Sequence, residues 1–107
     1  MSDFANIDAA QLQDLQHNGN GVLIDVRTDQ EVARGVIPGA RHISLQTLTA
    51  RFGEIERGRP IVFYCQSGAR SAQASYFLAS QGWGEVYNLA GGIVAWAGKG
   101  LPIAGMG

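Results

Sequence analysis

The chain has 107 residues, of which 46% are hydrophobic and 16% are charged, so it can bury one hydrophobic core but is too short for two. We therefore expect a single domain over residues 1–107. Eight Lys and Arg residues against nine Asp and Glu residues give a net charge of −1, which provides no broad positive field for binding nucleic acid or an anionic membrane.

The start of the chain and its single cysteine indicate where the protein is located and which kinds of cysteine site it can form. Residues 1–4 lack the basic start and apolar stretch of a signal peptide, and no long apolar run follows, so we expect a cytoplasmic protein. Cys65 is the one cysteine and cannot form an internal disulfide, and two histidines without a second cysteine do not supply a structural zinc site. The glycines form neither a GxGxxG nor a Walker motif, so no nucleotide is implied. We therefore expect neither a metal nor a cofactor.

The first half of the chain predicts two helices around a buried strand. A capping-box pattern followed by apolar residues at helical spacing predicts a helix over 8–17. Residues 22–26 form a nearly continuous apolar run, which is typical of a strand covered on both faces. Thr28 and Glu31 repeat the capping-box pattern directly after that strand, which predicts a short second helix.

The second half continues the alternation of strands and helices. A second apolar, β-rich run precedes a helix whose inner face includes Ala74 and Leu78, and Gly82 is a natural end for that helix. Glycines then form a turn before a last short helix. The expected elements are a short extended piece at 42–43, a helix within 45–55, strands at 61–65 and 86–89, and a helical turn over 93–96.

This alternation predicts an α/β fold with a central, mainly parallel sheet and helices on both faces. In such sheets, ligands bind beyond the carboxyl ends of the strands. Asp25 and Arg27 come at the end of one predicted strand, and Cys65 ends another. We therefore expect the thiol and this charged pair to project toward the same edge of the sheet.

Cys65 opens a short polar loop that contains Gly68 and leads through Arg70 into a helix. The first N–H groups of a helix have no intrahelical partner, and a turn at glycine can point further N–H groups toward one place. A sulfur there is stabilised as a thiolate. Lowering a cysteine pKa from about 8.5 to about 6.5 takes ~2.7 kcal/mol, which a few such donors and a guanidinium can supply. The alternative is that Cys65 is a small buried apolar residue and that Gly68 only makes a turn.

A series of motifs, taken in order along the chain, resembles the motif series of single-domain rhodaneses. The resemblance extends from about residue 7 to residue 96. It implies a rhodanese-like α/β fold and sulfurtransferase activity, in which Cys65 takes sulfane sulfur from a donor such as thiosulfate, becomes a persulfide, and passes the sulfur to cyanide or a thiol. The motifs are Leu23-Ile24-Asp25-Val26-Arg27, Glu31, Gly35-Val36-Ile37-Pro38-Gly39-Ala40, Cys65-Gln66-Ser67-Gly68-Ala69-Arg70-Ser71, Asn88-Leu89-Ala90-Gly91-Gly92-Ile93 and Trp96.

The length of the cysteine loop bears on the kind of chemistry. Rhodanese-related phosphatases and arsenate reductases have one more residue between cysteine and arginine, whereas the loop from Cys65 through Arg70 has the shorter, sulfur-type length. A small cysteine-dependent phosphatase or arsenate reductase, and a non-enzymatic binding module, are the alternatives. A single cysteine cannot resolve its own persulfide as a disulfide, so the sulfur acceptor is expected to be an external small molecule or a protein.

The resemblance assigns Cys65 as the nucleophile and the backbone N–H groups of Gln66, Ser67, Gly68, Ala69, Arg70 and Ser71 as the donors that hold the terminal sulfur. Arg70 is expected to attract the anionic donor or to orient the loop. An ion pair between Arg70 and a carboxylate is the structural alternative, and both roles are compatible.

Asp25 and Arg27 are expected to support the site. A carboxylate at a buried strand end accepts hydrogen bonds from a neighbouring loop or arginine, so Asp25 is expected to be structural. Arg27 is expected at the mouth of the site, with an ion pair to Glu31 as the alternative. We do not expect His42 to act as a base for the thiol, because the loop can stabilise the thiolate without one.

Overall fold

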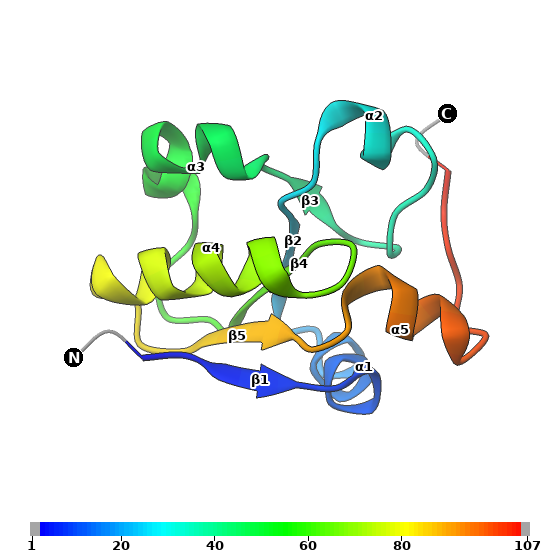
Figure 1. The fold of residues 1–107 in the computed structure, drawn as a ribbon. Helices are drawn as coiled ribbons and strands as arrows, with labels where there is room; N and C mark the ends of the chain where they lie inside the picture. The colour runs from blue at the N-terminus through cyan, green and yellow to red at the C-terminus, as the bar shows by residue number, and fades with distance from the viewer. Residues whose placement is uncertain (1–2, 106–107) are drawn as a thin grey trace.

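The computed structural model describes residues 3–105, which form a five-stranded sheet surrounded by helices (Figure 1). The strand order is β1-β5-β4-β2-β3, and every pairing between these strands is parallel. The strands are β1 (Ala5–Ile7), β2 (Val22–Asp25), β3 (Arg41–His42), β4 (Ile61–Tyr64) and β5 (Val86–Leu89). The helices are α1 (Ala9–His17), α2 (Asp29–Val32), α3 (Leu45–Arg51) with a 3-10 turn at Phe52–Glu54, α4 (Ala69–Ser80) and α5 (Gly92–Gly98).

Two hydrophobic clusters, one on each face of the sheet, form the core. Alternate residues of β2 and β4 point to opposite faces, so Ile24 and Phe63 pack with α3 and α4, whereas Leu23 and Val62 pack with α1 and α5. Figure 1 shows α3 and α4 above the sheet, and α1 on the other side. The predicted fold class, a mainly parallel sheet with helices on both faces, is confirmed.

The local signals in the sequence correspond to real element boundaries. Asp8 and Gln11 form a complete capping box at the start of α1, and Thr28 and Glu31 form another at the start of α2. Gly82 follows the last residues of α4 with a φ of 99°. The sequence analysis did not predict β1, a three-residue edge strand that pairs with β5.

The two strands that carry the predicted site residues are neighbours at the centre of the sheet. In the register of β2 and β4, Asp25 pairs with Tyr64, the residue before Cys65. The chain leaves β2 toward β3 on one side and leaves β4 toward β5 on the other, so the two connections diverge at this boundary. Such a divergence leaves a crevice at the carboxyl ends of the strands, where ligands bind in open α/β sheets.

No helix in the described part of the chain is long and apolar enough to cross a membrane.

Candidate active site

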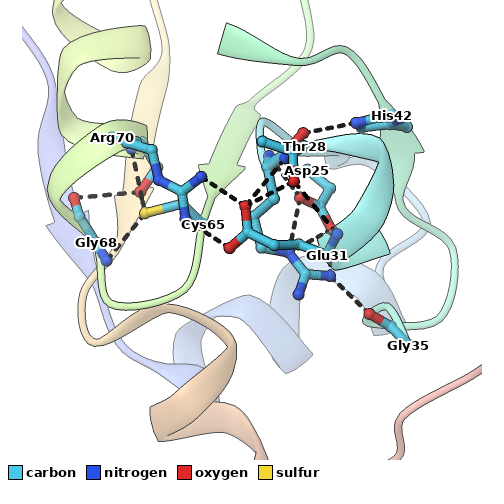
Figure 2. A network of polar contacts seen from close by, with 10 residues as sticks. Asp25, Thr28, Glu31, Gly35, His42, Cys65, Gly68 and Arg70 are labelled. Carbon is cyan, nitrogen blue, oxygen red and sulfur yellow. Dashed lines mark hydrogen bonds and ion pairs between the residues drawn. The ribbon is translucent and has the colours of Figure 1, made fainter. Parts of the chain in front are cut away.

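The Cys65 sulfur lies inside a loop, and two N–H groups of that loop donate to it. The loop joins β4 to α4, and Gly68 adopts a φ of 108° directly before the helix. Sγ accepts hydrogen bonds from the Gly68 N–H at 3.1 Å and the Ser71 N–H at 3.4 Å, and the Ser71 hydroxyl lies 3.4 Å away. Cys65 is only 1% exposed and packs in a core cluster, but its sulfur is surrounded by donors on the loop side. Figure 2 shows the sulfur inside the turn made by Gly68.

These contacts determine the ionisation of the thiol. Burial raises the pKa of Cys65, but hydrogen bonds from the Ser71 hydroxyl and N–H, the Gly68 N–H and the Ser67 N–H outweigh it, so the pKa lies below that of an ordinary cysteine. The loop therefore gives Cys65 a larger fraction of thiolate, the reactive form of cysteine, than an ordinary cysteine has at the same pH.

A buried asparagine on β5 holds the loop from behind. The Ser71 hydroxyl lies within hydrogen-bond distance of Asn88 Oδ1 as well as of Sγ, so its single proton is shared between these two acceptors. Asn88 Nδ2 donates to the Gly68 carbonyl at 3.3 Å and to Asn6 Oδ1 at 3.0 Å. Both Ser71 and Asn88 are buried. Asn88 thus fixes two of the residues that surround the sulfur, although it does not contact the sulfur itself.

Asp25 and Arg27 form a buried ion pair beside the loop. Arg27 Nε lies 3.1 Å from each Asp25 carboxylate oxygen, and Nη2 lies 2.8 Å from Oδ2. Arg27 Nη2 also donates to the Gly35 carbonyl at 2.6 Å, and Arg27 is 4% exposed. The structural role expected for Asp25 agrees with these contacts. The alternative ion pair between Arg27 and Glu31 is not formed, because the Arg27 guanidinium is hydrogen-bonded to Asp25.

Glu31 instead pairs with Arg70 across 39 residues of sequence. The two side chains form a bidentate pair with N–O distances of 2.7 and 2.8 Å, which joins α2 to the cysteine loop (Figure 2). The Arg70 guanidinium lowers the pKa of Glu31 to about 2, with a further contribution from the Thr28 cap. The ion pair named as the structural alternative for Arg70 is therefore present, and Glu31 offsets much of the charge that Arg70 would present to an anion.

The other predicted site residues lie around this centre. Gln66, Ser67 and Ala69 are exposed at the surface of the loop. His42 is partly buried, and its Nε2 lies 2.7 Å from the Arg27 carbonyl oxygen, so this nitrogen is engaged with the backbone. Arg70 also lines a pocket of about 540 Å³ that lies between α2 and α3. No group of three or more metal-ligating side chains occurs within residues 3–105.

Sequence reasoning missed two residues of this site. Asn88 was noted only as part of a motif, although a buried polar residue at the end of a strand in this sheet is itself a signal of the site. The sequence predicts Glu31 as a helix cap and as an alternative partner for Arg27. Nothing in the sequence shows that Arg70, 39 positions later, is its ion-pair partner in place of Arg27.

Comparisons with known proteins identify the relatives of this chain. A family model for the rhodanese-like domain matches residues 8–99. A sulfurtransferase from Allochromatium vinosum is 47% identical over 98 residues, which cover 91% of this chain and 92% of that protein. The thiosulfate sulfurtransferase GlpE from Ectopseudomonas mendocina is 38% identical over 96 residues, covering 90% of this chain and 87% of that protein.

A solved structure supports the same relationship. The rhodanese-related protein from Thermoplasma volcanium superposes with a TM-score of 0.86 at 29% sequence identity, and the match covers 94% of this chain and 98% of that one. The family model and these relatives therefore match nearly the whole chain, and the solved structure shares its fold. This chain belongs to the rhodanese-like domain family.

Proposed function

We propose that this protein is a sulfurtransferase that moves sulfane sulfur from thiosulfate to a thiophilic acceptor through a persulfide on Cys65. The observation that carries the proposal is the direction of the Gly68 and Ser71 N–H groups, which both donate to Sγ. Relatives named as sulfurtransferases support the reaction class.

The first half-reaction loads the protein. The Cys65 thiolate attacks the outer sulfur of thiosulfate, a bond forms between the two sulfurs, and the sulfur–sulfur bond of thiosulfate breaks with release of sulfite. Charge is conserved, since Cys65–S⁻ and S–SO₃²⁻ give Cys65–S–S⁻ and SO₃²⁻. The new terminal sulfur carries the negative charge, and inward N–H groups stabilise an anion at that position.

The second half-reaction discharges the protein. Cyanide attacks the terminal sulfur, the bond to Cys65 breaks, and thiocyanate leaves together with the restored thiolate. A thiol acceptor reacts in the same way and leaves as a persulfide. Since the chain has a single cysteine, no internal thiol competes for the sulfur.

Intact-mass measurement tests the proposal directly. Incubation with thiosulfate should add the mass of one sulfur atom, and subsequent cyanide should remove it and yield thiocyanate. Cys65→Ser should do neither. A wild-type mass that stays unchanged in excess thiosulfate contradicts the proposal, and hydrolysis of an aryl phosphate that depends on Cys65 would favour the phosphatase alternative instead.

A further inference from the structure

Asn88 is a polar residue on a strand face that otherwise packs in the core. Val86, two residues earlier on the same face of β5, and Phe63, the neighbour of Asn88 on β4, both belong to the cluster beneath α3 and α4. Asn88 is 4% exposed, and its partner Ser71 on α4 is fully buried. Burying two polar side chains costs free energy that an apolar pair would not, so packing alone does not account for them.

The neighbours of the Asn88 carboxamide fix its orientation. Nδ2 lies 3.3 Å from the Gly68 carbonyl oxygen, which accepts hydrogen bonds but cannot donate one. The amide nitrogen must therefore face Gly68, and it also donates to Asn6 Oδ1 at 3.0 Å. Oδ1 then faces Ser71, so at this contact Asn88 accepts and the Ser71 hydroxyl donates.

The Ser71 hydroxyl has one proton and three acceptors within reach. Asn88 Oδ1 is the closest at 2.5 Å, the Gly68 carbonyl oxygen lies at 3.2 Å, and Cys65 Sγ lies at 3.4 Å. Because the hydroxyl has a single donor, a full hydrogen bond to the sulfur requires the proton to leave Asn88. The stabilisation that the hydroxyl gives the thiolate is therefore reduced by the free energy of the Ser71–Asn88 hydrogen bond.

We propose that Asn88 is a positioning residue that competes with Cys65 Sγ for the Ser71 hydroxyl proton. When Sγ carries the negative charge, the hydroxyl turns toward the sulfur. When the charge has moved to the outer sulfur of a persulfide, the proton returns to Asn88. Asn88 thus limits the stabilisation of the resting thiolate and keeps it more nucleophilic, because the nucleophilicity of a thiolate falls with its pKa. The competition itself needs no sulfur transfer, whereas its consequence for the persulfide rests on the sulfurtransferase function proposed above.

Within residues 3–105, Cys65 is the one titratable side chain that hydrogen-bonds to Ser71 or Asn88. The charged side chains beside the cysteine loop are held in two ion pairs, Arg70 with Glu31 and Arg27 with Asp25. Neither pair includes a residue that the substitutions below replace. A change in the ionisation of Cys65 in those variants therefore reports on the hydroxyl and on the loop.

Asn88→Leu tests the competition, because it removes the acceptor and keeps a branched side chain of similar shape. The Gly68 carbonyl still accepts from the Ala72 N–H at 3.0 Å, so it is not left without a partner. With Asn88 Oδ1 absent, the Ser71 hydroxyl donates more fully to the sulfur. We expect the pKa of Cys65, measured by iodoacetamide alkylation at a series of pH values, to fall by about 1, which is the effect of one hydrogen bond.

The same substitution in a Ser71→Ala background separates the hydroxyl from the rest of the loop. Any loosening of the loop by Asn88→Leu is common to both backgrounds and cancels in the comparison. The pKa change caused by Asn88→Leu should be about 1 more negative when the Ser71 hydroxyl is present. Equal changes in the two backgrounds overturn the proposal.

Ser75→Ala is the matched control for the alkylation measurements. It removes another buried hydroxyl of α4, which donates to the Ser71 carbonyl at 2.8 Å and to the Tyr87 carbonyl at 3.3 Å. This variant should keep the wild-type pKa of Cys65. A fall as large as that in Asn88→Leu contradicts a specific competition for the Ser71 proton.

The two half-reactions give a second test, at a pH where Cys65 is fully ionised. A Brønsted coefficient of about 0.4–0.5 makes the Asn88→Leu thiolate roughly threefold slower in its attack on thiosulfate. The same thiolate is a better leaving group, so cyanide should discharge the persulfide faster than in the wild type. Changes of the same sign in both half-reactions contradict the proposal. Failure of the wild type to load contradicts the proposed function instead, and the alkylation comparison still tests the role of Asn88.

NMR follows the competition without any substitution at Asn88. As the pH rises, the hydroxyl leaves Oδ1 for the ionised sulfur, so the carboxamide carbon resonance of Asn88 should shift with a midpoint at the pKa of Cys65. Ser71→Ala should abolish this shift. A carboxamide resonance that does not respond to the ionisation of Cys65, or that responds equally in Ser71→Ala, overturns the proposal.

Discussion

The sulfur of Cys65 experiences two opposing effects, burial and hydrogen bonding, and their balance determines its reactivity. We expect the pKa found by iodoacetamide alkylation at a series of pH values to lie below that of free cysteine. The Ser71→Ala variant removes the hydroxyl but keeps the N–H donor, so its pKa should rise above the wild-type value. Since Cys65 is the one cysteine, the alkylation rate reports on it alone. A wild-type midpoint at or above that of free cysteine would show that burial dominates.

We expect Glu31 to limit how strongly the Arg70 guanidinium acts on the Cys65 thiolate. Arg70 interacts electrostatically with Cys65, and the Glu31 carboxylate offsets that charge. Glu31→Gln leaves an oxygen to cap Thr28 but removes the negative charge, so the pKa of Cys65 should fall below its wild-type value. The same alkylation titration measures the pKa of Cys65 in this variant. Glu54→Gln is the control, because it removes an acidic partner from Arg51 instead, and an equal shift in both variants would contradict a local effect.

At the scale of elements, α5 is locked against the cysteine loop through Gly92. This residue has a φ of 57°, and a Cβ there would overlap the carbonyl oxygens of Cys65 and Gln66. Gly92→Ala therefore combines backbone strain with a clash against backbone atoms that cannot move freely, and we expect it to lower the free energy of unfolding by about 3 kcal/mol or more. Urea denaturation gives this value.

Another glycine of the same helix is the control. Gly98 has an ordinary φ, and a Cβ there meets nothing within 4 Å, so Gly98→Ala should leave stability unchanged or raise it by about 0.5–1 kcal/mol. If Gly92→Ala and Gly98→Ala behaved alike, α5 would not be constrained by the loop.

The elements that the sequence predicts well are those with strong local patterns. Residues 22–26 and 61–65 predict the two central strands, because a strand buried on both faces requires a continuous apolar run. β1 lacks such a run, since only Ile7 of its three residues is buried, and it forms because β5 offers an open edge. The contacts of Arg70 and Asn88 were not predictable for a related reason. Their partners lie 39 and 17 residues away, and only the folded sheet brings them together.

At the scale of the whole molecule, two ion pairs tie distant segments together. Arg70 and Glu31 join α4 to α2, and Arg41 and Glu56 join β3 to the segment before β4. The arginine partner lowers the pKa of each glutamate to about 2, from an ordinary value of 4.5. Both pairs are partly exposed to solvent, so salt screens them, and they act on stability mainly through protonation.

The direction of this effect follows from the lowered pKa values. Between pH 4.5 and about 2, the unfolded chain binds protons that the folded chain does not, so acid drives unfolding. The stabilisation is complete above pH 4.5 and is lost as the pH falls through about 2. Urea midpoints at pH 6, 4 and 2.5 should therefore fall more steeply for the wild type than for the double variant Glu31→Gln/Glu56→Gln. Glu85→Gln is the control, because Glu85 takes part in none of the ion pairs found within residues 3–105. Its urea midpoint should fall with pH as steeply as that of the wild type. If the midpoint of the double variant also fell as steeply as that of the wild type, other groups would govern acid unfolding.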